Sequence, residues 1–148
     1  MTTNDVPATG TGRGGGDGGG ASRGGIVGLG TDLVEVERFR LALARRPTLP
    51  ARMFSADEQA YAARQHDPTP SLAVRFAAKE AVMKALGVGL GGFALRDVEV
   101  VRDDDAGTPT LVLHGAAEHL ARERGVTGWF VSLTHTDATA MAVAIATG

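Results

Sequence analysis

The sequence predicts one folded domain that combines helices with antiparallel strand pairs. The chain has 148 residues, of which 43% are hydrophobic, and this is enough for a single core. Apolar side chains recur at helical spacing between residues 72 and 86, whereas two later stretches have the period of strands joined by short polar turns. We therefore expect an enclosed helix in a domain that also contains strand hairpins.

The composition excludes several classes of protein. A net charge of −2 argues against a general nucleic-acid binder. No apolar run approaches the roughly 18 residues that a membrane-spanning helix needs. The chain contains no cysteine, which rules out a disulfide framework or a thiol-ligated zinc site and leads us to expect a cytoplasmic protein.

The amino-terminal stretch differs in composition from the rest of the chain. Residues 1–24 are dominated by glycine and carry almost no apolar side chain, so burial cannot offset the entropy of ordering them. They lack both the apolar segment of a signal peptide and the G-x-x-x-x-G-K-[ST] pattern of a phosphate loop. We expect a disordered extension in residues 1–24 and a folded domain in residues 25–148.

The domain is expected to begin with a strand from Gly25 that runs as far as Asp32. The glycines at 28 and 30 leave room for close approach of another backbone. A G-x-G pair without a third glycine is weak evidence for a dinucleotide site. An aspartate that follows a strand is most often a cap for the next helix, so Asp32 alone does not indicate a functional site.

Two helices are predicted between the first strand and the central helix. The first spans residues 34–46 and ends before Pro47. Its face with Arg38, Ala42 and Arg45 is either a solvated surface or a docking stripe for an acidic partner, and the lack of acidic residues on it favours docking. Residues 55–58 match a capping box that starts a short helix, and residues 67–70 read as a turn.

The central helix is the most clearly defined element. Its expected span is residues 72–86, with Ser71 as the N-cap and Gly87 as the left-handed residue that closes it. It is apolar nearly all round, so its charged side chains stand in poorly solvated surroundings that require a countercharge, a metal or a charged ligand. Glu80 and Lys84 are four residues apart, and the simplest interpretation is that they form an ion pair.

The last third of the chain is expected to contain two strand pairs separated by a helix. The final strand is apolar on both faces, which predicts a central position in its sheet. His135 ends the preceding strand, where a histidine serves as a structural residue more often than as a ligand. The aspartates in the 103–107 turn lack EF-hand spacing and indicate a solvated turn. The expected strands are residues 97–102, 110–113, 129–135 and 139–146, and the helix is residues 115–124.

Taken in order, these motifs resemble one family. A strand ends G-x-G-x-D-[IL]-V-E at residues 28–35, and the central helix carries R-F-x-x-K-E-A-x-x-K-A-x-G at residues 75–87. A D-[IV]-E-V strand at 97–100, a G-x-P turn at 107–109 and S-x-[ST]-H at 132–135 complete the series. The sequence from Gly25 onward is similar to the holo-[acyl-carrier-protein] synthase family of 4′-phosphopantetheinyl transferases.

The resemblance implies a reaction and a set of catalytic residues. The family transfers the phosphopantetheine arm of coenzyme A to a serine of apo-acyl carrier protein and releases adenosine 3′,5′-bisphosphate. Asp32 and Glu80 match the family's ligands for Mg²⁺, an ion that is typically held by one or two carboxylates and substrate phosphates. Glu80 is also the candidate general base, and Lys84 can reach a phosphate or the attacking oxygen.

The resemblance also implies binding residues, a fold and an assembly. Arg75 and His135 match positions near the nucleotide, where a 3′-phosphate would suit both, and Arg38 and Arg45 match the helix that docks the acidic carrier. The implied fold is α+β, with an antiparallel sheet wrapped around a long central helix. The implied assembly is a homotrimer whose subunit clefts hold coenzyme A.

Two alternatives to this function remain open at the level of sequence. The same chemistry could serve a carrier protein of polyketide type instead of one of fatty-acid synthesis. A non-catalytic module that binds coenzyme A or a carrier would use the arginine stripe without turnover. Retention of the acids and bases needed for transfer argues against the second alternative.

Overall fold

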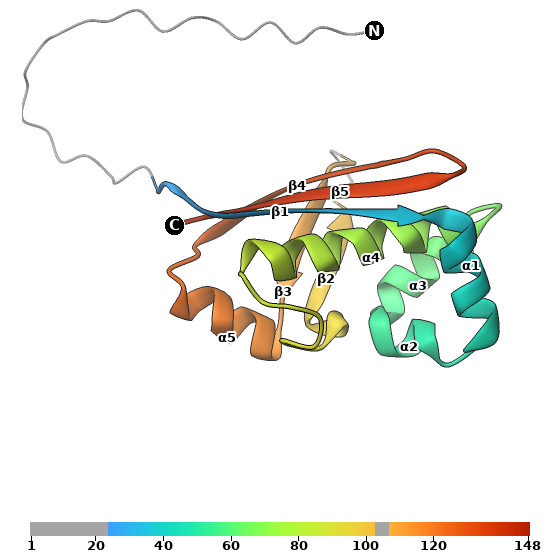
Figure 1. Ribbon diagram of the computed structural model, residues 1–148, viewed down its shortest axis with the longest axis horizontal. Coiled ribbons are helices and arrows are strands. Elements are labelled where there is room, and N and C mark those ends of the chain that lie inside the picture. Colours follow the sequence, from blue (N-terminus) through green and yellow to red (C-terminus); the bar gives the residue numbers. More distant parts are fainter. Residues whose placement is uncertain (1–23, 103–106) are drawn as a thin grey trace, which may run out of the picture.

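In the computed structural model, a three-stranded antiparallel sheet lies along one side of the long helix α4 (Pro68–Ala85) (Figure 1). The structure describes residues 24–102 and 107–148. The predicted extension, apart from Gly24, and most of the aspartate turn fall outside these residues. The other elements are β1 (Ile26–Glu35), α1 (Val36–Arg45), α2 (Leu49–Met53), α3 (Ala56–Ala63), the 3-10 turn η1 (Leu95–Asp97), β2 (Val98–Arg102), β3 (Pro109–Leu113), α5 (Gly115–Glu123), β4 (Gly128–His135) and β5 (Thr139–Thr147).

The strand order of this sheet is β1-β5-β4, so the prediction that the final strand is central is confirmed. The face of β5 that packs on α4 consists of small side chains, and these alanines are fully buried. Asp32 pairs with Ala142 in the interior of β1. The expectation that Asp32 ends the strand is therefore wrong, and it does not cap α1, whose N-cap residue is Glu35.

Helix α4 begins earlier than expected and ends where expected. Its N-cap is Asp67, whose side chain accepts a hydrogen bond from the Thr69 amide, so Ser71 lies inside the helix and residues 67–70 form its first turn. Proline fits there because the first helical amides have no partner within the helix. At the other end Gly87 has φ 65°, and the Gly87 and Val88 amides donate to the carbonyls of residues 84 and 83.

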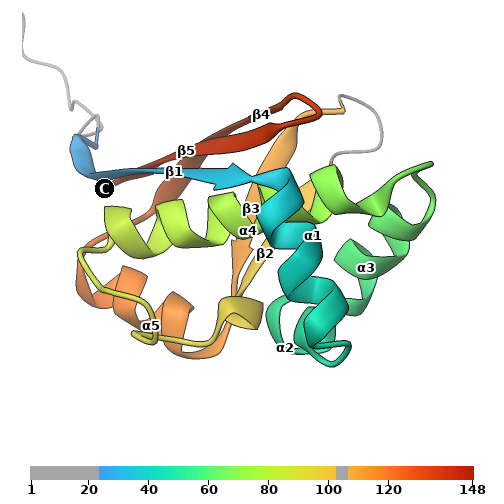
Figure 2. The same ribbon diagram turned by 45° about the vertical axis from the view of Figure 1, so that its right-hand side comes forward.

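The remaining elements enclose α4 on its other sides. Helices α1, α2 and α3 gather around its amino-terminal half, α5 lies on the side away from the sheet, and the β2–β3 hairpin crosses α4 and contacts β4 through β3 (Figures 1 and 2). One apolar cluster joins α4 to β2, α5 and β5, and a second joins it to α1 and α2. The α+β architecture and the enclosed helix are as predicted.

Local differences from the prediction are small. The Ser55 capping box is present in full, and it begins α3. Helix α1 is shorter at both ends than expected, and α2, which contains Pro50, had no sequence prediction. Over the parts of the chain described, 24–102 and 107–148, no helix is long and apolar enough to cross a bilayer.

Candidate active site

Asp32 and Glu80 are brought together because β1 lies unusually close to α4. A Cβ atom on Gly28 would lie 2.0 Å from the Ala85 carbonyl oxygen, and one on Gly30 would lie 1.9 Å from that of Ala81. Only glycine permits this contact. Alternate residues of a strand share a face, so Asp32 points to the same side as the two glycines and meets the next turn of α4, which carries Glu80. Both side chains line one cavity.

The two carboxylates interact electrostatically. The pKa of Glu80 is raised to about 7, first by burial and then by the charge of Asp32 and a hydrogen bond with it, while Lys84 opposes the shift. Asp32 is itself only 11% exposed. A carboxyl group with a pKa near neutrality can exchange a proton at physiological pH, which is the property that a general base requires.

Lys84 pairs with Asp32 rather than with Glu80. Its Nζ atom donates to Asp32 Oδ1 at 3.0 Å and to the Thr31 carbonyl oxygen at 2.8 Å. The predicted ion pair within the helix is thus replaced by a contact between α4 and β1. The side chain of Lys84 is 53% exposed, so its ammonium group remains accessible to a ligand.

The cavity beside this acidic pair extends to the arginine-bearing helix. Its volume is about 510 Å³, and α1 contributes Arg38 and Ala42 to its wall, with Phe76 on the α4 side. Arg45 is exposed on α1, and it does not line this cavity. Arg40 fixes α1 to the start of α4, since its guanidinium donates to the Asp67 carboxylate and to Thr69 Oγ1.

Arg75 and His135 line a different cavity, of about 390 Å³. Arg75 is 4% exposed, and its Nη1 atom donates to the carbonyl and hydroxyl oxygens of Ser71. Glu80 follows Arg75 by five positions, which places them about 140° apart around the helix. The structure of one chain therefore brings Asp32, Glu80 and Lys84 together, but it places Arg75 and His135 elsewhere.

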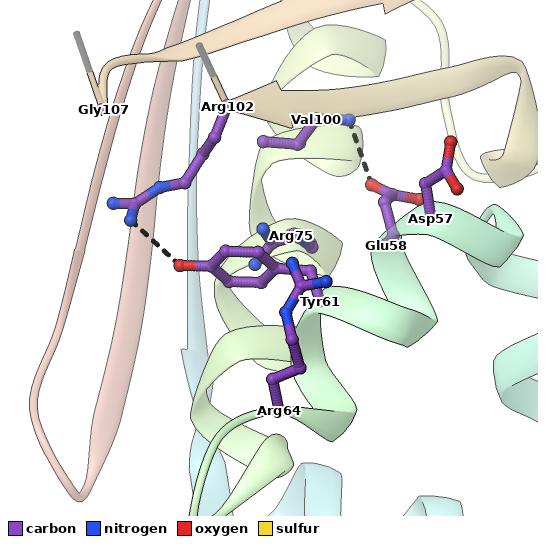
Figure 3. Close-up of a pocket in the computed structure, with 8 residues that line it drawn as sticks. All are labelled: Asp57, Glu58, Tyr61, Arg64, Arg75, Val100, Arg102 and Gly107. Atoms are coloured by element: carbon purple, nitrogen blue, oxygen red, sulfur yellow. Dashed lines mark hydrogen bonds between the residues drawn. The ribbon is translucent and has the colours of Figure 1, made fainter. Parts of the chain in front are cut away.

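Three residues of this second region had no sequence prediction. Tyr61 of α3 has Arg75 over its ring, together with Arg64 at the end of α3 and Arg102 at the end of β2 (Figure 3). Tyr61 and Arg64 come from α3 and Arg102 from β2, and none of them shares a helical or strand spacing with Arg75, so only the tertiary structure reveals them. Tyr61 and Arg102 also line the cavity that contains His135.

Comparison with known proteins agrees with these observations. The family model described as the 4′-phosphopantetheinyl transferase superfamily matches residues 28–144. A holo-[acyl-carrier-protein] synthase of Moorella thermoacetica is 49% identical over 116 residues, which cover 78% of this chain and 90% of the relative.

Solved structures resemble the fold as well. The holo-ACP-synthase of Plasmodium yoelii has a TM-score of 0.74 at 28% identity, covering 84% of this chain and 97% of that chain. The holo-(acyl-carrier-protein) synthase of Bacillus anthracis, in complex with CoA (3′,5′-ADP), has a TM-score of 0.69 at 29% identity, with coverage of 83% and 97%. The resemblance drawn from the motifs is confirmed, and this chain belongs to the 4′-phosphopantetheinyl transferase superfamily.

Proposed function

We propose that this enzyme transfers the 4′-phosphopantetheine group of coenzyme A to a serine of apo-acyl carrier protein. The observation that carries the proposal is the group formed by Asp32, Glu80 and Lys84 where β1 crosses α4. The names of its relatives support the reaction, and the coenzyme A bound in the Bacillus anthracis structure supports the donor. The cysteine-free composition agrees with a cytoplasmic location.

Proton transfer in this reaction falls to Glu80. As the serine hydroxyl attacks the β-phosphorus of coenzyme A, its proton passes to the Glu80 carboxylate. A bond forms between the serine oxygen and phosphorus, the bond from phosphorus to the bridging oxygen breaks, and adenosine 3′,5′-bisphosphate leaves. Negative charge grows on the phosphate oxygens during this step, and the exposed Lys84 ammonium group stabilises it.

Mg²⁺ fits the donor atoms of this site. Asp32 and Glu80 offer carboxylate oxygens only, which is the ligand type that Mg²⁺ prefers when substrate phosphates complete its shell. Burial raises the pKa of Glu80 most, and the charge of Asp32 raises it further, beyond what Lys84 compensates. We assign Asp32 and Glu80 as the ligands, and the bound ion would neutralise charge on the diphosphate.

The nucleotide and the carrier are assigned to the remaining predicted residues. Arg75 and His135 line one cavity and would bind the 3′-phosphate of coenzyme A. Arg38 and Arg45 are exposed on α1, on the side of the molecule that leads to Glu80, and would dock the acidic carrier. The Arg40 contacts with Asp67 and Thr69 hold this docking helix in place relative to α4.

A homotrimer is the assembly that we propose. Coenzyme A would have to reach both the acidic pair and the Arg75 cavity, which lie on different sides of α4, and a cleft shared by neighbouring subunits would join them. The outer face of the β1-β5-β4 sheet offers an interface, because it exposes large apolar side chains, namely Leu29, Leu33, Phe130 and Met141. Light scattering should give the mass of three chains, and Phe130→Glu should dissociate them.

A transfer assay tests the function directly. Incubation with coenzyme A, Mg²⁺ and an apo carrier should add about 340 Da to the carrier, the mass of the transferred group in this phosphoryl transfer. Intact-mass spectrometry of a panel of carriers from fatty-acid and polyketide pathways would measure the addition and its preference. No mass shift on any carrier would contradict the proposal.

A further inference from the structure

The second region contains the only tyrosine of the chain, and this residue lies among three arginines (Figure 3). Tyr61 is on α3, Arg64 caps the same helix, Arg75 comes from α4 and Arg102 ends β2. They line a cavity of about 310 Å³, which adjoins the one that contains His135 through their shared residues. Three elements thus direct positive charge into one small space.

Tyr61 contacts two of these arginines in different ways. The Arg75 guanidinium lies over its ring, with Cζ 4.3 Å from the ring centroid. The Arg102 Nη1 atom donates a hydrogen bond to the Tyr61 hydroxyl at 2.9 Å. Cation–π attraction strengthens as water is excluded, so the burial of Arg75 favours its contact with the ring.

Two acidic residues, Asp57 and Glu58, line this cavity, but within residues 24–102 and 107–148 neither forms an ion pair with the three arginines. The Glu58 carboxylate lines the cavity but is bound to Lys79 and to the amides of Ser55 and Val100. Arg75 Nε is buried and has no hydrogen-bond partner in the part of the chain that the structure describes. Burial lowers the pKa of Arg75, and the charge of Arg102 lowers it further, against the opposing effect of Glu58. A buried cation with an open donor favours an anionic ligand.

We propose that Tyr61 is a positioning residue, whose ring orients Arg75 and whose hydroxyl orients Arg102 so that both guanidinium groups face a single phosphate. Without Tyr61 the two cations would repel each other and separate. This inference rests on the proposed function, because the phosphate in question is the 3′-phosphate of coenzyme A. It adds Arg102 to the residues that select coenzyme A over its 3′-dephospho form.

Calorimetry in a chelating buffer without carrier separates this role from a structural one. The unmodified protein should bind coenzyme A about tenfold or more tightly than 3′-dephospho-coenzyme A, as expected for charge-assisted contacts with one phosphate. Tyr61→Phe keeps the ring and should reduce this ratio about threefold, whereas Tyr61→Leu removes both contacts and should bring it near one. Affinity for the dephospho form should stay the same in all variants.

A double-mutant cycle tests whether the Tyr61 hydroxyl acts through Arg102. Arg102→Ala should lower the ratio, and adding Tyr61→Phe to it should cause little further loss, because the two groups act as one unit. Equal binding of both ligands by the unmodified protein, or equal weakening of both by Tyr61→Leu, would overturn the inference. If the Tyr61→Leu variant transfers the phosphopantetheine arm but keeps the full affinity ratio, the inference fails and the proposed function stands. If the unmodified protein binds neither coenzyme A nor its 3′-dephospho form, both fail.

The single tyrosine allows a second readout. Incorporation of 3-fluorotyrosine places one fluorine label in the chain, so its ¹⁹F NMR spectrum reports on this position alone. Coenzyme A should shift the resonance, and 3′-dephospho-coenzyme A at the same occupancy should shift it much less. The same shift with both ligands would contradict a phosphate contact beside Tyr61.

Discussion

Two lysines on α4, five residues apart, stand in opposite electrostatic situations. Lys79 is completely buried and donates to Glu58 Oε2 at 2.8 Å and to the carbonyl oxygens of residues 95 and 98. Lys84 is half exposed and donates to one oxygen of Asp32 and to one carbonyl oxygen. The first lysine has a partner for each of its three protons, whereas the second keeps capacity to bind a ligand.

The acidic partners differ in the same way. Glu58 accepts from Lys79 and from two backbone amides, which leaves a fully bonded pair in the interior. Near Lys84 the ammonium group bonds to Asp32 rather than to Glu80, and burial together with the charge of Asp32 raises the pKa of Glu80. A buried charge network that is complete holds the fold together, whereas an incomplete one at a cavity marks the place where a ligand supplies the missing charge.

The largest expected effect is on catalysis. Glu80→Gln should lower the transfer rate by about 10²–10⁴-fold, the range for loss of a general base, and Asp32→Asn should act similarly. Glu80→Gln should not lower stability at pH 7, because it removes repulsion between the carboxylates; Asp32→Asn removes the same repulsion and the ion pair with Lys84, so it should change stability by less than about 1 kcal/mol. Rates at saturating coenzyme A and urea unfolding measure the two quantities. A rate loss that only tracks a loss of folded protein would argue against catalytic roles.

Removing Lys79 from its buried pair with Glu58 should have the opposite effect, a loss of stability without a loss of activity. Lys79→Met leaves the Glu58 carboxylate buried without its cation, which should cost about 3–5 kcal/mol in the free energy of unfolding. Transfer activity per folded molecule should change little, because Lys79 reaches neither cavity of the proposed site. Urea denaturation gives the stability, and rates corrected for folded fraction give the activity. A stable variant without activity would contradict the assignment of Lys79 to the fold.

The sequence predicts those parts of the site that depend on local pattern. Close approach of β1 was predicted from Gly28 and Gly30, and the structure places both against backbone atoms of α4. The end of α4 at Gly87 follows from backbone conformation alone. Asp32 and Glu80 were paired only through the family motif, because 48 positions of chain separate them and no helical or strand period spans that distance.

The errors of prediction have a common physical cause. Ser71 has the side chain of an N-cap, but Asp67 caps the helix because Arg40 and the Thr69 amide both bind its carboxylate. The helical spacing taken alone pairs Lys84 with Glu80, although β1 offers it Asp32. In each case a contact between distant elements prevails over a valid local preference.

Lys84→Met provides the matched control for Lys79→Met. It removes the same ammonium group from the same helix, but at an exposed position, so the free energy of unfolding should change by less than about 1 kcal/mol. The transfer rate should fall about 10–10²-fold, since one cation near the phosphates is lost. Lys84→Arg should retain part of the rate. Unfolding curves and rates of both methionine variants, measured together, test whether the two lysines divide stability and activity between them.

The smallest effect is a pH dependence of stability that originates at Glu80. Its pKa is about 7 in the folded chain against 4.5 ordinarily, so between these values the unfolded chain has lost a proton that the folded chain keeps. The free energy of unfolding should therefore fall as pH rises from 4.5 to 7, by about 1 kcal/mol once the partial exposure of the group is considered. Glu80→Gln should lack this component, so the difference between the two proteins isolates it. Mg²⁺ should remove the decline, because it binds the deprotonated carboxylate. A difference that is independent of pH would show that the charge at this site is already balanced, and the contrast between the two lysines would then have no electrostatic basis.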